Sequence, residues 1–190
     1  MIEELITSNR SCRRFAQSEE ITLDTLRWLV NLARLSGSAA NLQPLKYILA
    51  NDPQKNQMIF SWLAWAGYLP DWPGPPEGER PAAYIIVLGD LELAKHSAVD
   101  VGIAAQSILL GARSRGLAGC MIGSINKERL REGLNLPARY DLLLVLALGK
   151  PKETVVLEEV GPGGSIKYWR DEHGVHHVPK RRLEDLILSL

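Results

Sequence analysis

The sequence predicts one compact domain in which apolar strands and helices pack around a common core. Of its 190 residues, 46% are hydrophobic, which is enough for a substantial interior in a chain of this length. Residues 83–88 form a continuous apolar run, as expected of a strand covered on both faces. Residues 101–112 carry an apolar stripe with helical spacing. No internal repeat or linker divides the chain, so residues 1–190 are expected to form a single domain.

The first part of the chain predicts two helices. Thr22 is suited to cap the second of them, which has Asp24 in its first turn and is expected to stop at Gly37. Its apolar residues recur at helical spacing: Leu26, Leu29, Val30 and Ala33. The short opening helix has one apolar face, formed by Ile2, Leu5 and Ile6.

A strand over residues 46–50 is expected to lead into a third helix. Asp52 and Pro53 look like a cap followed by proline at the first helical position, and the helix is expected to end near Gly67. Residues 68–81 then contain five prolines, which exclude a helix or a central strand. A loop this long is either a lid or a plain surface insertion, and the sequence leaves both open.

The helix over residues 101–112 is expected to be central, or to lie at a subunit interface, and to end at Gly116. Small residues on it permit close packing of another helix: Gly102, Ala104, Ala105 and Gly111. Three further elements follow: a strand over 117–122, a helix over 127–134 capped by Asn126, and a strand over 142–148.

The chain changes character after these elements. Residues 152–160 are charged, residues 161–164 break the chain, and residues 166–169 are predicted to pair with 175–178 across a turn. The hairpin contains three histidines, so a metal site has to be considered: His173, His176 and His177. Neighbouring side chains on a strand point to opposite faces, which favours a surface hairpin over a metal site.

Composition excludes several classes of function. The chain has 22 basic and 22 acidic residues, so it lacks the broad basic surface that nucleic acids and anionic membranes require. No apolar run is long enough for a membrane span, and the N-terminus is acidic where a signal peptide would be basic. Only Cys12 and Cys120 are present, without paired spacing, so we expect no disulfide and a cytoplasmic location.

The main candidate for a functional site is the segment 9–15, which concentrates Arg10, Ser11, Arg13 and Arg14. Guanidinium groups bind phosphate oxygens in a bidentate manner, and a serine hydroxyl adds a hydrogen bond. Taken alone, the segment predicts either an anion site or a solvated basic turn. A nucleophilic role for Cys12 is a weaker alternative, because no histidine lies beside it, and Cys120 is expected in the core.

A second basic cluster at residues 180–182 narrows the interpretation. Two basic clusters, two turns rich in glycine or amides and many flat apolar side chains suit a ligand with a phosphate tail and a large heterocycle. Motifs for nucleoside triphosphates, dinucleotides and serine hydrolysis are absent from the sequence.

Four segments, in the right order, resemble the FMN-dependent nitroreductase family. Residues 10–15 resemble its R-S-x-R-x-F motif, and residues 38–44 resemble its S-x-x-N-x-Q-P turn. Residues 100–123 resemble its long central helix and the glycine-ended strand that follows, and residues 179–185 resemble its C-terminal basic element. Asn9, Cys12, Gly37 and the segments 68–81 and 166–178 depart from the family pattern.

The resemblance implies an α+β fold, with a mixed sheet surrounded by helices in an intertwined homodimer. FMN would be bound at the dimer interface. Ser38, Ala39 and Asn41 would come from the partner subunit, the backbone at Ile122 and Gly123 would approach the flavin N5 region, and the remaining contacts would be Arg10, Ser11, Arg13 and either Lys180 or Arg181. No metal is implied.

The function implied by the resemblance is an NAD(P)H-dependent flavin oxidoreductase acting on a nitroaromatic, a quinone or a similar acceptor by a ping-pong mechanism. FMN carries the chemistry, and Arg13 is the candidate cation near flavin N1/O2, whereas Arg14 is interpreted as a solvated residue. Two roles are open for four aromatic residues, which either stack on an acceptor or belong to the core or rim: Trp62, Trp65, Tyr68 and Trp72. Two alternatives remain: a specialised flavin reductase of dehalogenase or ene-reductase type, and a flavin-binding sensor or carrier with little turnover.

Overall fold

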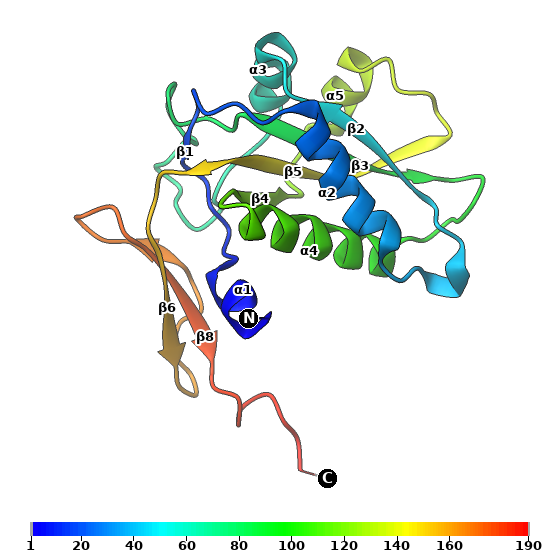
Figure 1. Ribbon diagram of the computed structural model, residues 1–190. Helices are drawn as coiled ribbons and strands as arrows, with labels where there is room; N and C mark the ends of the chain where they lie inside the picture. Colours follow the sequence, from blue (N-terminus) through cyan, green and yellow to red (C-terminus); the bar gives the residue numbers. More distant parts are fainter. Residues whose placement is uncertain (1, 190) are drawn as a thin grey trace.

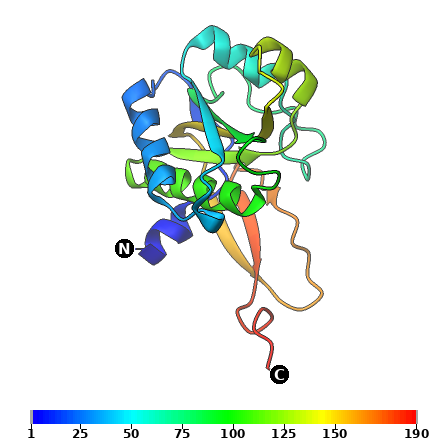
Figure 2. The ribbon, with the colours of Figure 1, turned by 90° about the vertical axis from the view of Figure 1, so that its right-hand side faces the viewer.

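The computed structural model describes residues 2–189 and shows a sheet with helices on both faces (Figures 1 and 2). Its strand order is β1-β5-β3-β2, and β4 also pairs with β5. Every one of these strand pairs is antiparallel, so the expectation of a mixed main sheet was wrong. The strands are β1 Phe15–Ala16, β2 Leu45–Ala50, β3 Ala83–Asp90, β4 Ala118–Ile122 and β5 Tyr140–Pro151.

Two layers of helix cover the sheet. Helices α2 and α4 pack on one face and α3 and α5 on the other, as the core clusters around Ile108 and Leu130 show. The eight residues of β3 are all buried because the strand lies between these layers, which confirms the prediction from its continuous apolar run. The helices are α1 Ile2–Ser8, α2 Leu23–Leu35, α3 Pro53–Ser61, α4 Ala98–Ser114 and α5 Lys127–Gly133.

Local capping signals predicted the helix starts correctly. The side chains of Thr22, Asp52 and Asn126 accept hydrogen bonds from backbone N–H groups at the starts of α2, α3 and α5. Close packing was also confirmed at Gly111, where a Cβ atom would lie 2.3 Å from Cδ1 of Leu32 on α2. The apolar face predicted for α1 is not packed into the core, since Ile2 is 63% exposed.

The end of α3 was predicted wrongly. The helix stops at Ser61 rather than near Gly67, because Leu63 forms a bridge with Ile125 and the amide of Ala64 donates to the carbonyl of Ser124. Residues 68–81 contain no helix or strand, as predicted. No helix within residues 2–189 is long and apolar enough to cross a membrane.

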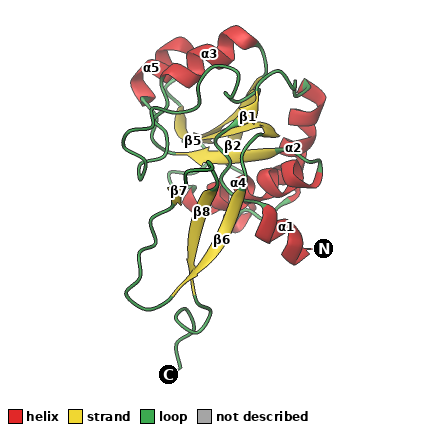
Figure 3. Cartoon of the chain, turned by 90° about the vertical axis from the view of Figure 1, so that its left-hand side faces the viewer, coloured by secondary structure: helices red, strands yellow, loops and turns green. Residues whose placement is uncertain are grey.

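A second, smaller sheet projects from one side of the main sheet (Figure 3). β7 Trp169–Arg170 pairs antiparallel with β8 His176–Arg181, which confirms the predicted hairpin in part. The sequence did not predict β6 Val155–Val160, which pairs parallel with β8. Its residues are intermediate or exposed and include consecutive glutamates, so neither burial nor alternation marks the strand in the sequence.

Candidate functional site

The arginine segment is attached to the main sheet along β4 and β5. Ser11 forms a parallel bridge with Gly119, and the amide of Cys12 donates to the carbonyl of Gly119 at 3.0 Å. Phe15 pairs with Pro151 and packs against Gly149, where a Cβ atom would lie 2.7 Å from the phenyl ring. The sheet therefore fixes the backbone on both sides of Arg13.

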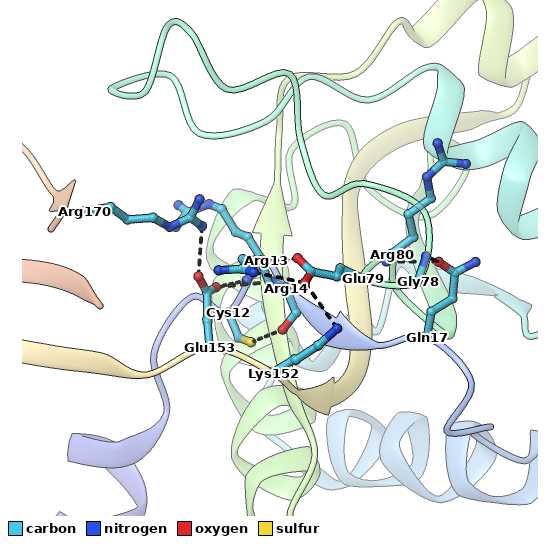
Figure 4. Close-up of polar contacts among 10 residues, drawn as sticks. All are labelled: Cys12, Arg13, Arg14, Gln17, Gly78, Glu79, Arg80, Lys152, Glu153 and Arg170. Carbon is cyan, nitrogen blue, oxygen red and sulfur yellow. Dashed lines mark hydrogen bonds and ion pairs between the residues drawn. The ribbon is translucent and has the colours of Figure 1, made fainter. Parts of the chain in front are cut away.

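Glu153 holds the same segment from the other side (Figure 4). Its side chain is completely buried and accepts hydrogen bonds from the backbone N–H groups of Arg13 and Arg14. It also accepts a bond of 2.8 Å from Nη2 of Arg170, a residue of β7. One carboxylate therefore joins the arginine segment to the small sheet.

Arg14 is paired with Glu79, so the interpretation of Arg14 as a solvated residue was wrong. Its Nε and Nη2 donate to the two carboxylate oxygens at 2.5 and 2.9 Å, and Lys152 Nζ lies 3.2 Å from the same group. The loop is tied down further by Gln17, which accepts bonds from the amides of Gly78 and Arg80 (Figure 4). Residues 78–80 are thus fastened to the body of the protein.

The Glu79 carboxylate predicts a loss of stability in acid. The hydrogen bond from Arg14 is the main reason that its pKa falls from about 4.5 to about 2. The ionised form therefore stabilises the fold above pH 4.5, and this contribution is lost as the pH falls towards 2. Because Arg14 and Lys152 are partly exposed, we expect Glu79→Gln to lower the free energy of unfolding by about 1–2 kcal/mol at pH 6.

Urea titrations of wild type and Glu79→Gln at pH 6 and pH 3 test this expectation. The difference in unfolding free energy between the two proteins should be smaller at pH 3. Glu92→Gln is the matched control, since the Glu92 side chain is 63% exposed and is paired with the partly exposed Arg139. An equal difference at both pH values would contradict the role given to Glu79.

Arg10 and Arg13 differ from Arg14 in having no carboxylate partner among residues 2–189. Nη2 of Arg10 donates to the carbonyl of Ile6 at 2.7 Å, while its buried Nε has no hydrogen-bond partner. Arg13 is 9% exposed, and its Nη1 lies 3.2 Å from Nε2 of His176. Two partly or fully buried cations without a carboxylate partner among residues 2–189 are an arrangement that a bound anion would stabilise.

These two arginines line a cavity of about 270 Å³. An adjoining cavity of about 150 Å³ shares Arg13, Met121 and Tyr168 with it and reaches the end of β4. The first cavity is lined by both ends of the chain and by α4, through Asn9, Arg10, Ser11, Gln106, Lys180 and others. The second is lined by residues 64–67 and by Cys120, Ile122, Gly123 and Ser124.

One chain brings together only part of the predicted site. Arg10, Ser11, Arg13 and Lys180 line the first cavity, and Ile122 and Gly123 line the second. Arg181 is exposed and lines neither.

The predicted residues of the turn at 38–41 lie elsewhere. Ser38 lines a separate cavity of about 220 Å³, together with Arg34, Lys46 and Asp100. The amide of Ala39 donates to the buried Asp100 at 3.2 Å, and Asn41 is exposed with a φ of +55°. The residue before it, Ala40, also has a positive φ, which is a strained conformation for alanine. The family resemblance implied that this turn contributes to the cofactor site of a partner subunit.

The cysteines do not carry the chemistry that was considered for Cys12. Burial, with the Glu153 carboxylate as a second cause, raises the pKa of the Cys12 thiol to about 12, which contradicts an activated thiolate. Cys120 is buried in β4, as predicted.

Three of the aromatic candidates are held by the protein itself. Trp65 lies between Phe60 and Gly74, Trp72 lies under the Arg170 guanidinium, and Trp62 packs against Gly133. Tyr68 is 47% exposed, and its ring contacts Tyr168 at 4.9 Å between centroids. Among these four candidates, Trp65 lines the second cavity, and Tyr68 adjoins it through Tyr168, which lines both cavities.

No signal in the sequence marked Tyr168 or Glu153, and His176 was predicted on a surface hairpin in preference to a metal site, which its burial contradicts. Tyr168 lies under the Arg13 guanidinium at 4.7 Å, and the His176 side chain is fully buried. Burial, followed by the charge of Arg13, lowers the pKa of His176 to about 4. His177 points away from the site, stacks on Trp169 and pairs with Glu158 and Asp171. The opposite orientation of the two histidines was predicted from their positions on a strand.

Comparisons with known proteins add independent information. The model of the nitroreductase family matches residues 6–150, which leaves the small sheet outside the match. The NADPH-flavin oxidoreductase of Vibrio harveyi is 26% identical over 79% of this chain and 65% of that protein. The FMN reductase (NADPH) of Bacillus subtilis is 27% identical over 78% of this chain and 65% of that protein. The solved structure of an FMN-dependent nitroreductase from Clostridium difficile has a TM-score of 0.66 and 22% identity, covering 80% and 88% of the two chains.

Proposed function

We propose, because this chain belongs to the nitroreductase family, that it is an FMN-dependent oxidoreductase that passes electrons from NAD(P)H to a small-molecule acceptor. The observation that carries the proposal is the pair of cations without carboxylate partners, Arg10 and Arg13, in one cavity. A plain basic turn would be exposed to water or neutralised by acidic neighbours, as Arg14 is by Glu79.

The residues present fit FMN. The unpartnered Nε of Arg10 is a buried donor that requires an acceptor, and a phosphate oxygen supplies one. Ser11 and Lys180 line the same cavity and add a hydroxyl and a second cation. The shared cavity wall of Met121 and Tyr168 then leads from this phosphate end to Gly123.

The end of β4 suits the approach of a flat ring. A Cβ atom added at Gly123 would meet no atom within 4 Å, so the backbone there is open to a ligand. The chemistry that FMN supplies when bound is hydride acceptance and electron donation. Arg13 adds a fixed positive charge in a buried position, where it stabilises negative charge more strongly than in water.

We infer a ping-pong order, in which the donor and the acceptor use the same open position beside Gly123 in turn. The donor and the acceptor would both approach beside Gly123 and the Tyr68–Tyr168 pair, so they would bind in turn. The exposed face of Tyr68 favours a planar acceptor such as a nitroaromatic or a quinone.

The complete site is proposed to form in a homodimer. Ser38, Ala39 and Asn41 would reach the site of the partner subunit, which gives the strained turn at Ala40 a role. Large apolar side chains are exposed on α1, on α4 and near the C-terminus, as expected of an interface: Ile2, Ile6, Val99, Ile103, Leu186 and Ile187. Sedimentation equilibrium should give a dimer, and a stable monomer that binds FMN would contradict shared sites.

A flavin-binding sensor or carrier is the second candidate, and the fastened loop favours it. Residues 68–79 are fastened by contacts of Glu79 with Arg14, of Trp72 with Arg170 and of Tyr68 with Tyr168. Because Tyr168 lines both cavities, a loop that stays fastened would limit exchange at the cofactor. A specialised flavin reductase, of dehalogenase or ene-reductase type, would use the same site with a different acceptor.

Anaerobic reduction of the FMN-loaded protein distinguishes these functions. Rapid bleaching by NADH or NADPH, followed by rapid reoxidation with nitroaromatics or quinones, is the expected result. Slow bleaching by both donors would favour the sensor or carrier, and reoxidation only by halogenated or unsaturated acceptors would favour a specialised reductase. Protein that takes up no FMN would contradict all three.

A further inference from the structure

The Arg13 guanidinium has no carboxylate partner among residues 2–189, and its side-chain contacts are with uncharged rings. Its Nη1 lies 3.2 Å from Nε2 of His176, and its guanidinium carbon lies 4.7 Å above the ring of Tyr168. A guanidinium has donors only, so Nε2 of His176 must accept and the ring proton must be on Nδ1. The low pKa of His176, about 4, agrees with this neutral tautomer.

The nearest carboxylate is engaged elsewhere. Glu153 accepts from the backbone of Arg13 and from the side chain of Arg170, and it forms no ion pair with the Arg13 guanidinium. Within residues 2–189 no carboxylate pairs with that guanidinium, so its charge is not neutralised inside the protein. A carboxylate at the position of His176 would form a close pair with Arg13 and remove most of its field from the cavity.

β8 places His176 at the cavity by strand alternation. His176, Val178 and Lys180 share one face of the strand, and all three line the cavity that also holds Arg10 and Arg13. The amide of His176 donates to the carbonyl of Thr154 at 2.9 Å, which fixes the strand next to Glu153. The ring of Tyr168 also packs against His176, with 5.2 Å between the two ring centroids.

We propose that His176 is a positioning residue that holds the Arg13 guanidinium in place with a neutral acceptor, so that its full charge faces the anionic side of the bound flavin. The inference rests on the proposed function, because it takes the cavity to be the FMN site. It goes beyond the family match, since β8 lies outside residues 6–150. The small sheet is then part of the electrostatics of the site.

The first test uses wild-type protein without cofactor. Two-dimensional ¹⁵N–¹H spectra of the histidine side chains distinguish an accepting ring nitrogen from a protonated one. The expected result for His176 is an accepting Nε2 and a protonated Nδ1, unchanged between pH 8 and pH 5.5. A protonated Nε2 would overturn the inference, whether or not the protein binds FMN.

The second test compares variants by FMN affinity and by the midpoint potential of the bound flavin. His176→Gln retains an acceptor and should restore both values relative to His176→Leu, which removes it. His176→Glu adds a carboxylate. We expect it to reduce the ratio of the affinity for reduced FMN to that for oxidised FMN about ten-fold, which lowers the midpoint potential of the bound flavin by about 30 mV for two electrons. His177→Gln is the matched control, because His177 faces away from Arg13 and should leave both values unchanged.

The outcomes separate the inference from the proposed function. If wild type binds FMN and is active, but His176→Glu keeps the wild-type midpoint potential, the inference alone is overturned. Failure of wild type to take up FMN would overturn the proposed function and, with it, the role of His176 towards the flavin. If His176→Glu does not fold, the comparison of His176→Gln with His176→Leu and the wild-type spectra still decide the matter.

Discussion

Replacing Glu153 by alanine is expected to lower the free energy of unfolding by about 3–5 kcal/mol, the scale of a broken buried ion pair. The Glu153 side chain is completely buried and Arg170 is 15% exposed, so the variant leaves a cation without a partner. It also leaves the amides of Arg13 and Arg14 without their acceptor. The loss should therefore affect both stability and the arrangement of the arginine segment.

Urea unfolding measures the first effect, and the affinity for FMN measures the second. Glu159→Ala is the matched control: Glu159 lies on β6, close to Glu153 in the chain, but its ion pair with Arg182 is largely exposed, so the change should lower the free energy of unfolding by less than about 1 kcal/mol. Glu153→Gln keeps the shape and one acceptor oxygen, and it should fall between the two. If Glu153→Ala and Glu159→Ala were equally stable, Glu153 would not join the two sheets.

Elements with local signals were predictable from the sequence. β3 was predicted because eight consecutive buried positions must be apolar or small, apart from its final aspartate. The starts of α2, α3 and α5 were predicted because each depends on a single capping side chain. Gly111 was informative because a small residue on a long helix matters only where another helix approaches closely.

Elements that depend on distant partners were not predictable. β6 has half-exposed residues with no alternation, and its existence depends on pairing with β8 across a long connection. The end of α3 is set by a bridge to Ile125, which no residue within the helix reveals. Arg14 was misread for the same reason, since Glu79 is 65 residues away in the chain.

The residues of the candidate site differ in the same way: those marked by local motifs were predicted, and those that depend on distant contacts were not. Arg10, Ser11, Arg13 and Lys180 were proposed because motifs mark them, and the fold places them around one cavity. Tyr168 lies in the segment 166–178, where the sequence departs from the family pattern, and Glu153 lies in the charged segment 152–160, which carries no motif. His176 was noticed only as one of three histidines, because its contact with Arg13 spans 163 residues.

Arg10→Ala is expected to weaken FMN binding by about 1–3 kcal/mol, the scale of a lost hydrogen bond between charged groups. The effect should depend on the phosphate, because Arg10 presents a buried, unpartnered Nε in the cavity that also contains Ser11 and Lys180. Riboflavin carries the same ring without the phosphate. The preference of wild type for FMN over riboflavin should therefore fall in the variant by a factor between about 5 and about 150.

Fluorescence titration of apoprotein with FMN and with riboflavin measures this preference directly. Arg14→Ala is the matched control: it removes an arginine from the same segment, but one already neutralised by Glu79, so it should reduce stability and leave the preference unchanged. Equal losses for FMN and riboflavin in Arg10→Ala would place Arg10 near the flavin ring or in a structural role. An unchanged preference with unchanged affinity would remove Arg10 from the cofactor site and leave Lys180 as the cation that meets the phosphate.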